Sequence, residues 1–297
     1  MIKKNIILEK KNCSNKEIIK FINKFHRGFK VLSPKEKKQE ISKIFYELKN
    51  KKFSKTNDKN RQNIWNKSWS RPAKFKNFFV PTYAQKINFF RICGKLIYTE
   101  SQFLEQRISQ YLLKYIFKKY VNKKLNICEF GAGSGKNIIF LKKQKLVKNL
   151  YASDWVDSAV RLIKKNGKLN NLQIKSFKFN IKEPNHDIDF VKNNIVMTHH
   201  ALEQVYNKYK KFINLLIKKK PQIVVHVEPI VENYDKNNDL DKSAIKFHKQ
   251  RNYLNGLKTY LNNLSDNKKI KILKDKRFYF GTKYHEGYSL IIWRTVN

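Results

Sequence analysis

The chain has 297 residues, 41% of them hydrophobic, which is enough for one sizeable core. No apolar run approaches the roughly 18 residues of a membrane span, and the N-terminus lacks the long apolar segment of a secretory signal. The cysteines are few and widely spaced, at Cys13, Cys93 and Cys128, which is typical of a reducing compartment and not of a zinc site. We therefore expect a cytoplasmic protein without a metal site.

The formal net charge of +42 would ordinarily indicate a nucleic-acid partner. Only nine of the 65 basic residues are arginine, however, and recognition of bases and phosphates depends heavily on the planar fork of arginine. The lysines are spread along the whole chain, together with many residues whose codons are rich in A and T. Because a biased genome would give the same composition, nucleic acid is the less favoured partner.

Residues 1–98 are predicted to form a helical and irregular N-terminal region. Apolar residues recur at helical spacing from 15 to 29. Ser33-Pro34 is typical of a helix start, with serine as the N-cap and proline in the first turn. The remainder is rich in aromatic residues without clear periodicity. Such segments often form lids or substrate walls, so this region is either a substrate lid or an extension packed over the core.

After the N-terminal region, strands and helices alternate. Thr99-Glu-Ser-Gln102 resembles a capping box and predicts a helix that leads into a strand at 125–130. The later expected elements are helices at 136–145, 156–165, 200–217 and 238–263, and strands at 149–153, 172–179, 194–198 and 222–227. This alternation predicts a parallel sheet covered on both faces. The segments 269–280 and 284–294 follow each other with only a turn near Gly281, which predicts an antiparallel hairpin.

The strand at 125–130 ends in Glu129 and is followed by glycines at alternate positions, Gly131, Gly133 and Gly135. A phosphate-binding P-loop would need another glycine five residues before Gly135 and a serine or threonine after Lys136. A dinucleotide fingerprint would need glycine in place of Lys136. The pattern E-F-G-x-G-x-G instead resembles motif I of the class I S-adenosylmethionine-dependent methyltransferases. The alternative is a purely structural turn.

This resemblance covers roughly residues 99–297. It implies an α/β fold with a Rossmann-like, mostly parallel, seven-stranded sheet that ends in an antiparallel hairpin, preceded by the helical and irregular extension of residues 1–98. It also implies S-adenosylmethionine as the cofactor. In the family, the acid and the glycine loop face the methionine part of this cofactor. The matching positions are Glu129, Gly131, Ala132, Gly133 and Gly135.

The loop after the second strand supplies a further cofactor candidate. An acid about twenty residues beyond a glycine loop is placed to accept hydrogen bonds from both ribose hydroxyls, and Asp154 lies 21 residues after Gly133. The alternative is that Asp154 only caps a helix. Trp155 and Val156 would flank the adenine. Asn180 stands where the family often has an aspartate that accepts from the adenine amino group.

The segment after the fourth strand contains Thr198, His199 and His200, and the resemblance places it beneath the cofactor's methyl group. A hydroxyl acceptor needs a base, and histidine suits that role near neutral pH. Glu203 lies four residues after His199 and would share a helix face with it. Glu228, at the end of the fifth strand, is a candidate for orienting a substrate hydroxyl or acting as base. The alternatives are packing or helix capping for the histidines and a lysine salt bridge for Glu228.

Three further residues complete the candidates. His226 lies inside a strand and is expected to be a core histidine. His248 and Arg251 can share a helix face, where they would hold an anionic or hydroxyl-rich substrate or else face solvent. No diagnostic metal motif joins these histidines and acids.

The favoured hypothesis is an enzyme that methylates a small hydroxylated metabolite or sugar. The methyl acceptor would be an oxygen, with His199 or His200 as base and Glu228 in support. An amine acceptor is an alternative. A second hypothesis is an RNA or DNA methyltransferase, although the motif of amino-group base methylases is absent after the fourth strand. A third is a methyltransferase-like binding protein that has lost activity.

Overall fold

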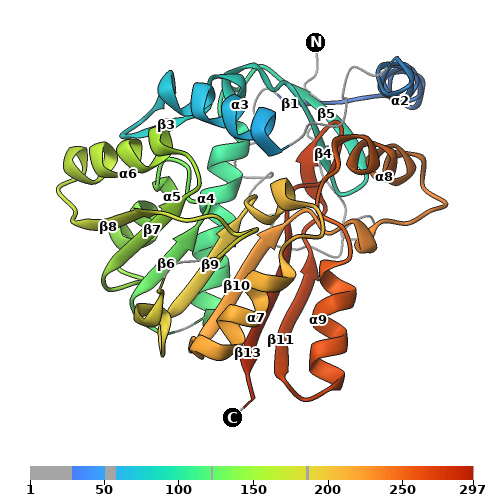
Figure 1. Ribbon diagram of the computed structural model, residues 1–297. Coiled ribbons are helices and arrows are strands. Elements are labelled where there is room, and N and C mark those ends of the chain that lie inside the picture. The colour runs from blue at the N-terminus through green and yellow to red at the C-terminus, as the bar shows by residue number, and fades with distance from the viewer. Residues whose placement is uncertain (1–28, 51–57, 122, 185–186, 297) are drawn as a thin grey trace.

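A computed structural model describes residues 29–50, 58–121, 123–184 and 187–296. Its centre is a seven-stranded sheet in the order β11-β13-β10-β9-β6-β7-β8 (Figure 1). The strands are β6 (Ile127–Phe130), β7 (Leu150–Asp154), β8 (Ile174–Lys178), β9 (Ile195–His199), β10 (Ile223–Glu228), β11 (Ile270–Arg277) and β13 (Ser289–Thr295). Only β13 runs antiparallel to its neighbours β10 and β11. The predicted Rossmann-like sheet with its closing antiparallel pair is confirmed.

Helices cover both faces of this sheet, as expected for parallel strands whose side chains are buried on both sides. They are α4 (Leu104–Ile116), α5 (Lys136–Lys143), α6 (Asp157–Leu169), α7 (Lys210–Lys219), α8 (Asp239–Arg251) and α9 (Leu257–Asp266). One apolar core joins α4 and α5 to one face of the sheet, and a second joins α7 and α9 to the other. Among the helices that the structure describes, none has the length and hydropathy of a membrane span.

The described part of the N-terminal region contains two α-helices and several short strands. The helices are α2 (Pro34–Lys49) and α3 (Asp58–Ser70), and the strands are β1 (Phe29–Val31), β2 (Ala73–Phe75), β3 (Phe78–Val80), β4 (Phe89–Ile92) and β5 (Lys95–Thr99). The predicted start of α2 is confirmed, because the Ser33 side chain accepts from the Glu36 N–H and proline occupies the first turn. The helix expected at 15–29 lies outside the described residues, apart from Phe29 in β1.

A second, smaller sheet ties this region to the C-terminal part of the chain. Its order is β1-β5-β4-β12, where β12 is Phe280–Thr282. Gly281 therefore lies inside a strand that pairs with β4, and not in the simple turn that the sequence predicted. These strands are an addition to the predicted helical and irregular region. β4 is mostly buried, so its sequence shows no alternation between apolar and polar residues.

Three predicted helix boundaries are wrong. Thr99 ends β5 instead of capping a helix, and α4 begins at Leu104. The segment 200–217 contains a 3-10 helix, Leu202–Val205, before α7. The segment 238–263 is two helices, because the chain turns through the left-handed region at Asn252 and again at Gly256.

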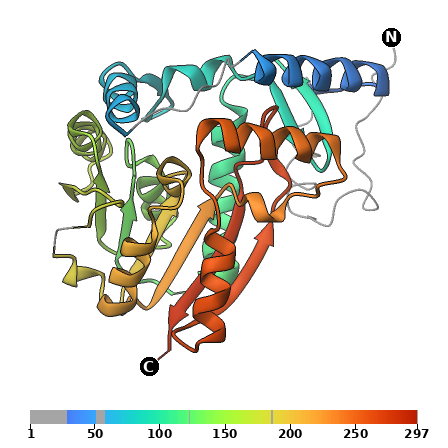
Figure 2. The same cartoon turned by 45° about the vertical axis from the view of Figure 1, so that its right-hand side comes forward.

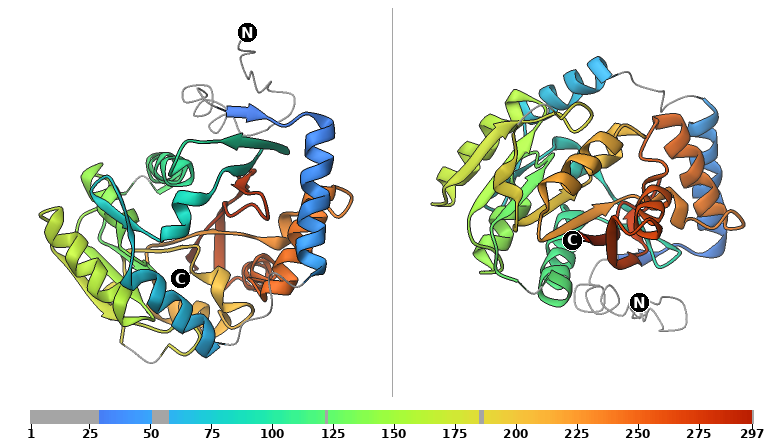
Figure 3. Two further views of the ribbon diagram at one scale, coloured as in Figure 1. Left: turned by 90° about the horizontal axis from the view of Figure 1, so that it is seen from above. Right: turned by 60° about the horizontal axis from the view of Figure 1, so that its bottom comes forward.

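The N-terminal elements lie along the edge of the sheet to which the parallel strands point, at the top of Figures 1 and 2. Seen from above, α2 lies beside α8 and α3 beside α6 (Figure 3). The N-terminal region thus borders the loops that follow the parallel strands, which is where an open α/β sheet binds its ligands.

Candidate functional site

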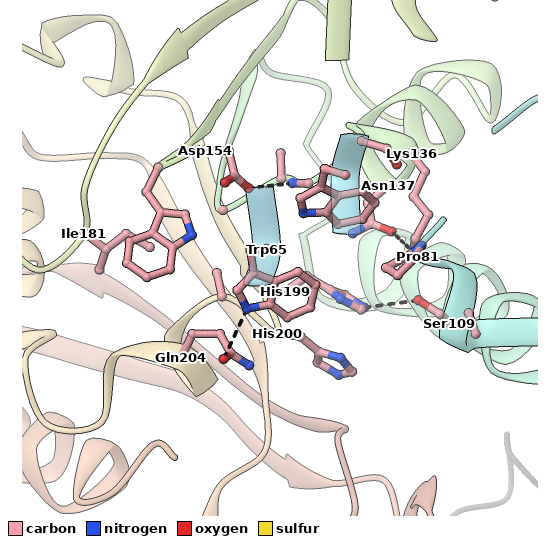
Figure 4. A pocket seen from close by; sticks show the side chains of 18 of the residues that line it. Trp65, Pro81, Ser109, Lys136, Asn137, Asp154, Ile181, His199, His200 and Gln204 are labelled. Atoms are coloured by element: carbon pink, nitrogen blue, oxygen red, sulfur yellow. Dashed lines mark hydrogen bonds between the residues drawn. The ribbon is translucent and has the colours of Figure 1, made fainter. Parts of the chain in front are cut away.

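A cavity lies at the carboxyl ends of the central strands, where the chain order reverses. β6 has β7 on one side and β9 on the other, so the chain crosses over β6 after completing β8. This is the topological switch point of the sheet. The cavity (Figure 4) is lined by Trp65, Trp69, Pro81, Tyr83, Ala84, Glu105, Gln106, Ser109, Gly131, Ala132, Gly133, Ser134, Lys136, Asn137, Asp154, Trp155, Phe179, Asn180, Ile181, His199, His200, Ala201, Gln204, Val205 and Tyr288.

The glycine loop between β6 and α5 forms one wall of the cavity. Gly131 and Gly133 have φ angles of +71° and +57°, a backbone conformation that residues other than glycine rarely adopt. A Cβ on Gly131 would lie 2.3 Å from the Cβ of Ala201, so the loop approaches the β9 turn too closely for any other residue. Gly135 lies outside the cavity lining and serves as the N-cap of α5.

Asp154 joins the glycine loop to the loop after β7. The Gly133 N–H donates to Asp154 Oδ2 at 2.9 Å, and the Val156 N–H donates to Oδ1 at 3.2 Å. The N-cap of α6 is Val156, so Asp154 is not a helix cap. Burial raises the pKa of Asp154 to about 6. Its carboxylate lines the cavity and retains capacity to accept hydrogen bonds from a ligand.

Apolar and amide groups follow Asp154 around the wall. Trp155, Phe179 and Ile181 line the cavity beyond β7 and β8, and Asn180 lies among them. The Asn180 Oδ1 atom accepts from the Lys182 N–H at 3.1 Å, so the amide is held by its own loop. This part of the cavity offers a flat apolar surface beside a polar edge.

Glu129 lies behind the cavity and acts through its neighbours. It is fully buried and does not appear in the lining, contrary to a direct contact expected from the motif. Asn137 Nδ2 donates to Glu129 Oε1 at 2.7 Å, and Lys136 Nζ donates to Asn137 Oδ1 at 2.9 Å. Glu129 Oε2 has no hydrogen-bond partner within the described ranges. Burial raises the pKa of Glu129 and lowers that of Lys136, which lines the cavity.

His199, the last residue of β9, and His200, which follows it, both line the cavity. His199 Nε2 and Ser109 Oγ lie 3.1 Å apart (Figure 4). The His200 backbone has φ of +55°, and its ring packs on Tyr288 with centroids 4.6 Å apart. His200 Nε2 is buried and has no partner in the part of the chain that the structure describes. Burial lowers the pKa of His200 to about 4, so the ring is neutral at pH 7.

Thr198 and Glu228 do not reach the cavity, which corrects their predicted roles. Glu228 Oε1 accepts from the N–H groups of Ala201 and Leu202 at 3.0 and 3.1 Å, and Oε2 accepts from the Glu203 N–H at 3.1 Å. Glu228 is fully buried, holds the turn after β9 and is not among the residues that line the cavity. Within the part of the chain that the structure describes, it forms no salt bridge to a lysine, which was the alternative expectation. Thr198 is also fully buried, with its Oγ1 2.9 Å from His226 Nδ1.

His226 is a core histidine, as expected. The Trp293 indole N–H donates to His226 Nε2 at 3.0 Å, which leaves Nδ1 as the protonated nitrogen that donates to Thr198. Both ring nitrogens are therefore satisfied, and the side chain is fully buried.

A second pocket adjoins the cavity and contains two of the three predicted substrate residues. The two pockets share Trp65, Tyr83, Glu105, His200 and Gln204. The other residues that line the second pocket are Arg61, Ile64, Ser68, Ile87, Glu203, Arg251, Tyr253, Thr282, His285 and Gly287.

Within this second pocket, the predicted residues are Glu203 and Arg251. Glu203 does not share a helix with His199, because His199 ends β9 and Glu203 lies in the following 3-10 helix. His248 lies outside the pocket, and its Nε2 is 3.1 Å from Nδ1 of His285, which lines it. His248 therefore supports a wall residue and does not contact the pocket itself.

Sequence reasoning missed residues that come from outside the sheet loops. Trp65, Trp69, Pro81 and Tyr83 come from the N-terminal region, and Glu105 and Ser109 come from α4. Burial raises the pKa of Glu105, whose Oε1 lies 3.4 Å from the Tyr288 hydroxyl. The only sequence signal was the pair of tryptophans in an otherwise polar stretch. Tyr288, directly before β13, also lines the cavity.

No protein-family model matches the chain, and no curated protein matches it. Among solved structures, the chain is similar to the methyltransferase domain of bacterial CtHen1, with 15% identity over 64% of this chain and 99% of that chain, and a TM-score of 0.47. It is also similar to magnesium protoporphyrin IX methyltransferase from Synechocystis PCC 6803, with 14% identity over 65% and 80% of the two chains and a TM-score of 0.44. A ribosomal protein L11 methylase from Lactobacillus delbrueckii subsp. bulgaricus has 18% identity over 64% and 79%, with a TM-score of 0.43. All three similarities are distant.

Proposed function

We propose that this protein is a class I S-adenosylmethionine-dependent methyltransferase that methylates a hydroxyl oxygen of a small metabolite or sugar. One observation carries the proposal. The glycine loop, Asp154 and the two histidines come from three different strand ends, and all line one cavity at the switch point of the sheet. The resemblance assigns the glycine loop and Asp154 to cofactor binding. It places the two histidines beside the methyl group that is transferred.

The residues around the cavity fit the cofactor group by group. Asp154 offers carboxylate oxygens for the two ribose hydroxyls. Trp155 and Ile181 offer an apolar slot for adenine, with the Asn180 amide at its edge. Lys136 offers a cation for the carboxylate of the methionine part. Asn137 connects Lys136 to Glu129, whose Oε2 has no partner among the described residues. When bound, the cofactor supplies a methyl group on a positively charged sulfur.

The chain's own residues would position the acceptor and remove its proton. Methyl transfer is an in-line displacement, so most of the rate depends on orientation. His200 lines both pockets, and its neutral ring has a buried Nε2 without a partner among the described residues, which makes it the favoured base for an acceptor hydroxyl. His199 is already bonded to Ser109 and would act by positioning. We do not retain Glu228 as a base, because its oxygens are occupied by backbone N–H groups.

The second pocket is the proposed acceptor site, and the N-terminal region is its proposed lid. Trp65 lies between the two pockets, and its indole N–H reaches Gln204 Oε1 at 3.4 Å (Figure 4). Glu203 and Arg251 would contact the acceptor, while His248 would hold His285. We assign residues 1–98 to this covering role and residues 99–297 to the methyltransferase domain.

The decisive experiment is a calorimetric titration with S-adenosylmethionine and S-adenosylhomocysteine. Wild-type protein should bind with micromolar affinity, and Asp154→Ala should lose at least about tenfold because it removes charge-assisted bonds to the ribose. Asp157→Ala is the matched control, since Asp157 is an exposed carboxylate three residues away. A folded wild-type protein that binds neither compound would sink the cofactor assignment.

A nucleic-acid acceptor is the second candidate, and one observation favours it. A groove beside Trp155 and Asn180 is lined by five lysines and a single aspartate, Asp58, and by one exposed glutamate. The lysines are Lys59, Lys182, Lys208, Lys210 and Lys211. Filter binding with RNA and DNA at rising salt tests this candidate, because binding to phosphates weakens steeply as counterions are added. Weak binding of both RNA and DNA at low salt would exclude a nucleic-acid acceptor.

A further inference from the structure

Two arginines face the second pocket from different parts of the chain. Arg61 belongs to α3 and Arg251 ends α8. Both guanidinium groups lie over the same ring, with the Cζ atoms of Arg61 and Arg251 at 5.8 and 5.3 Å from the centroid of Tyr253. Two like charges are therefore held close together at one wall of the pocket.

Arg61 is a fixed charge. Its side chain is buried, with Nη1 donating to the Gln204 carbonyl at 2.8 Å and Nη2 donating to the Arg251 carbonyl at 2.7 Å. Its Nε atom is buried and finds no acceptor among the described residues. These bonds to backbone carbonyls hold the guanidinium in place but do not neutralise its charge.

Arg251 has N–H groups to spare. Within the described ranges, the Arg251 side chain forms one hydrogen bond, in which Nη2 donates to the Tyr253 hydroxyl at the long distance of 3.4 Å. It forms no ion pair with any described residue. Arg277 shows the contrast, since it forms ion pairs with Asp241 at 2.7 Å and Glu286 at 2.6 Å. Arg251 thus presents a free planar fork at the pocket wall.

The carboxyl groups of this pocket do not cancel the two positive charges. Burial, together with the nearby Glu228, raises the pKa of Glu203 to about 8, so Glu203 is largely protonated at pH 7. Burial also raises the pKa of Glu105. Desolvation is the largest cause that lowers the pKa of Arg61, and the charge of Arg251 lowers it further, although Tyr253, Glu203 and Asp58 act in the opposite direction.

We propose that the second pocket binds an acceptor that carries an anionic group, a carboxylate or a phosphate, through the guanidinium of Arg251. This inference rests on the proposed function and narrows its substrate class to acidic hydroxylated molecules. The fork of arginine matches two oxygens of either anion. The long-range charge of Arg61 adds to the attraction. His200 lies in the wall shared with the cofactor cavity, so an acceptor anchored at Arg251 extends its hydroxyl toward the proposed base.

The test measures binding of three matched probes to protein saturated with S-adenosylhomocysteine: D-glucose, D-glucuronate and D-glucose 6-phosphate. Calorimetry should show that at least one anion binds at least about tenfold more tightly than glucose, the effect of one charge-assisted contact. The two anions distinguish a carboxylate from a phosphate ligand. Arg251→Gln should remove the preference without loosening α3, because Arg61 bonds to the backbone carbonyl of residue 251.

Lys249→Gln is the control, since it removes one exposed positive charge from the same helix and should change the affinities less than twofold. The proposal is overturned if glucose binds as tightly as both anions, if neither anion binds, or if Arg251→Gln and Lys249→Gln behave alike. Binding of S-adenosylhomocysteine is measured first. Its absence would contradict the proposed function, whereas normal cofactor binding without an anion preference would contradict this inference alone.

Discussion

The indole of Trp69 lies directly against Gly133, so that a Cβ on Gly133 would be only 2.4 Å from Cζ2 of the tryptophan. Gly133 belongs to the glycine loop of the sheet, and Trp69 belongs to α3 of the N-terminal region. Stacking of Trp65 on Trp69, with ring centroids 6.0 Å apart, continues this contact across the cavity. The N-terminal region and the cofactor cavity therefore depend on each other for their shape.

We expect Gly133→Ala to weaken binding of S-adenosylhomocysteine at least about tenfold. A left-handed φ at a non-glycine residue costs roughly 1–2 kcal/mol, and the new methyl group would also displace Trp69. In the Trp69→Ala background, the same Gly133→Ala change should cost less stability than in the wild type, because the collision is absent there and the backbone strain remains. Calorimetry and thermal melting measure the two effects.

Gly94→Ala is the matched control for that experiment. Gly94 has φ of +74°, and no heavy atom of the described residues outside its chain neighbours lies within 4 Å of its added Cβ, so this variant measures backbone strain without a collision. Equal losses of melting temperature in Gly94→Ala and Gly133→Ala would show that Trp69 does not restrict the loop.

Cofactor affinity should depend on pH through Asp154. Burial raises the pKa of this carboxyl to about 6 in the free protein, and only the ionised form can accept from both ribose hydroxyls. The dissociation constant should therefore rise as pH falls below 6, approaching tenfold per pH unit, and level off above pH 7. His200, with a pKa of about 4, stays neutral across this window. Titrations at pH 5, 6 and 7 check the slope, and Asp154→Asn should flatten it.

The central fold was predictable because each part of it leaves a local pattern. Buried parallel strands read as short apolar runs, and the glycine loop stands at the end of the first. The smaller sheet was not predictable in the same way. β4 lies mostly buried and shows no alternation, and its partner β12 lies almost two hundred residues further along the chain. The break between α8 and α9 depends on Asn252 adopting a left-handed conformation, which composition only weakly signals.

The residues of the candidate site likewise fall into those that local sequence predicts and those that only tertiary packing brings together. Asp154, Gly131 and Gly133 lie in a motif with fixed spacing, so local sequence was enough to place them in one cavity, although not to show that Gly135 lies outside it. Glu228 stands at a strand end, where a carboxylate that acts as a base was expected, but it accepts hydrogen bonds from three backbone N–H groups of the neighbouring turn. Trp69 and Glu105 reach the cavity from elements that precede the sheet. Only the three-dimensional packing reveals either fact.

Glu228→Ala should destabilise the fold by about 2–4 kcal/mol, since it leaves the N–H groups of residues 201–203 without acceptors in a buried turn. Thermal and chemical denaturation measure the loss, and Asp157→Ala serves as the surface control. A Glu228→Ala protein that melts like the wild type but no longer transfers methyl groups would contradict the structural role and restore the catalytic one.

His200→Asn should lower kcat by roughly 10²–10⁴ while leaving the affinity for S-adenosylhomocysteine unchanged, because it removes the proposed base and little else. Asparagine is chosen because it tolerates the left-handed backbone that His200 adopts, with φ of +55°. His199→Asn should have a smaller effect, since His199 Nε2 is already bonded to Ser109. Methyl transfer to an acidic hydroxylated acceptor is the assay.

The pH profile of that reaction separates a hydroxyl acceptor from an amine. With burial lowering the pKa of His200 to about 4, a wild-type enzyme that uses this base should gain activity between pH 3 and 5 and stay level through neutrality, provided that S-adenosylmethionine is kept saturating so that protonation of Asp154 does not limit the rate. His200→Asn should lose that limb. An amine acceptor needs no base once it is deprotonated, so its rate would follow the pKa of the substrate. Wild-type, His199→Asn and His200→Asn proteins would then share one profile, and the assignment of oxygen as the acceptor would fall.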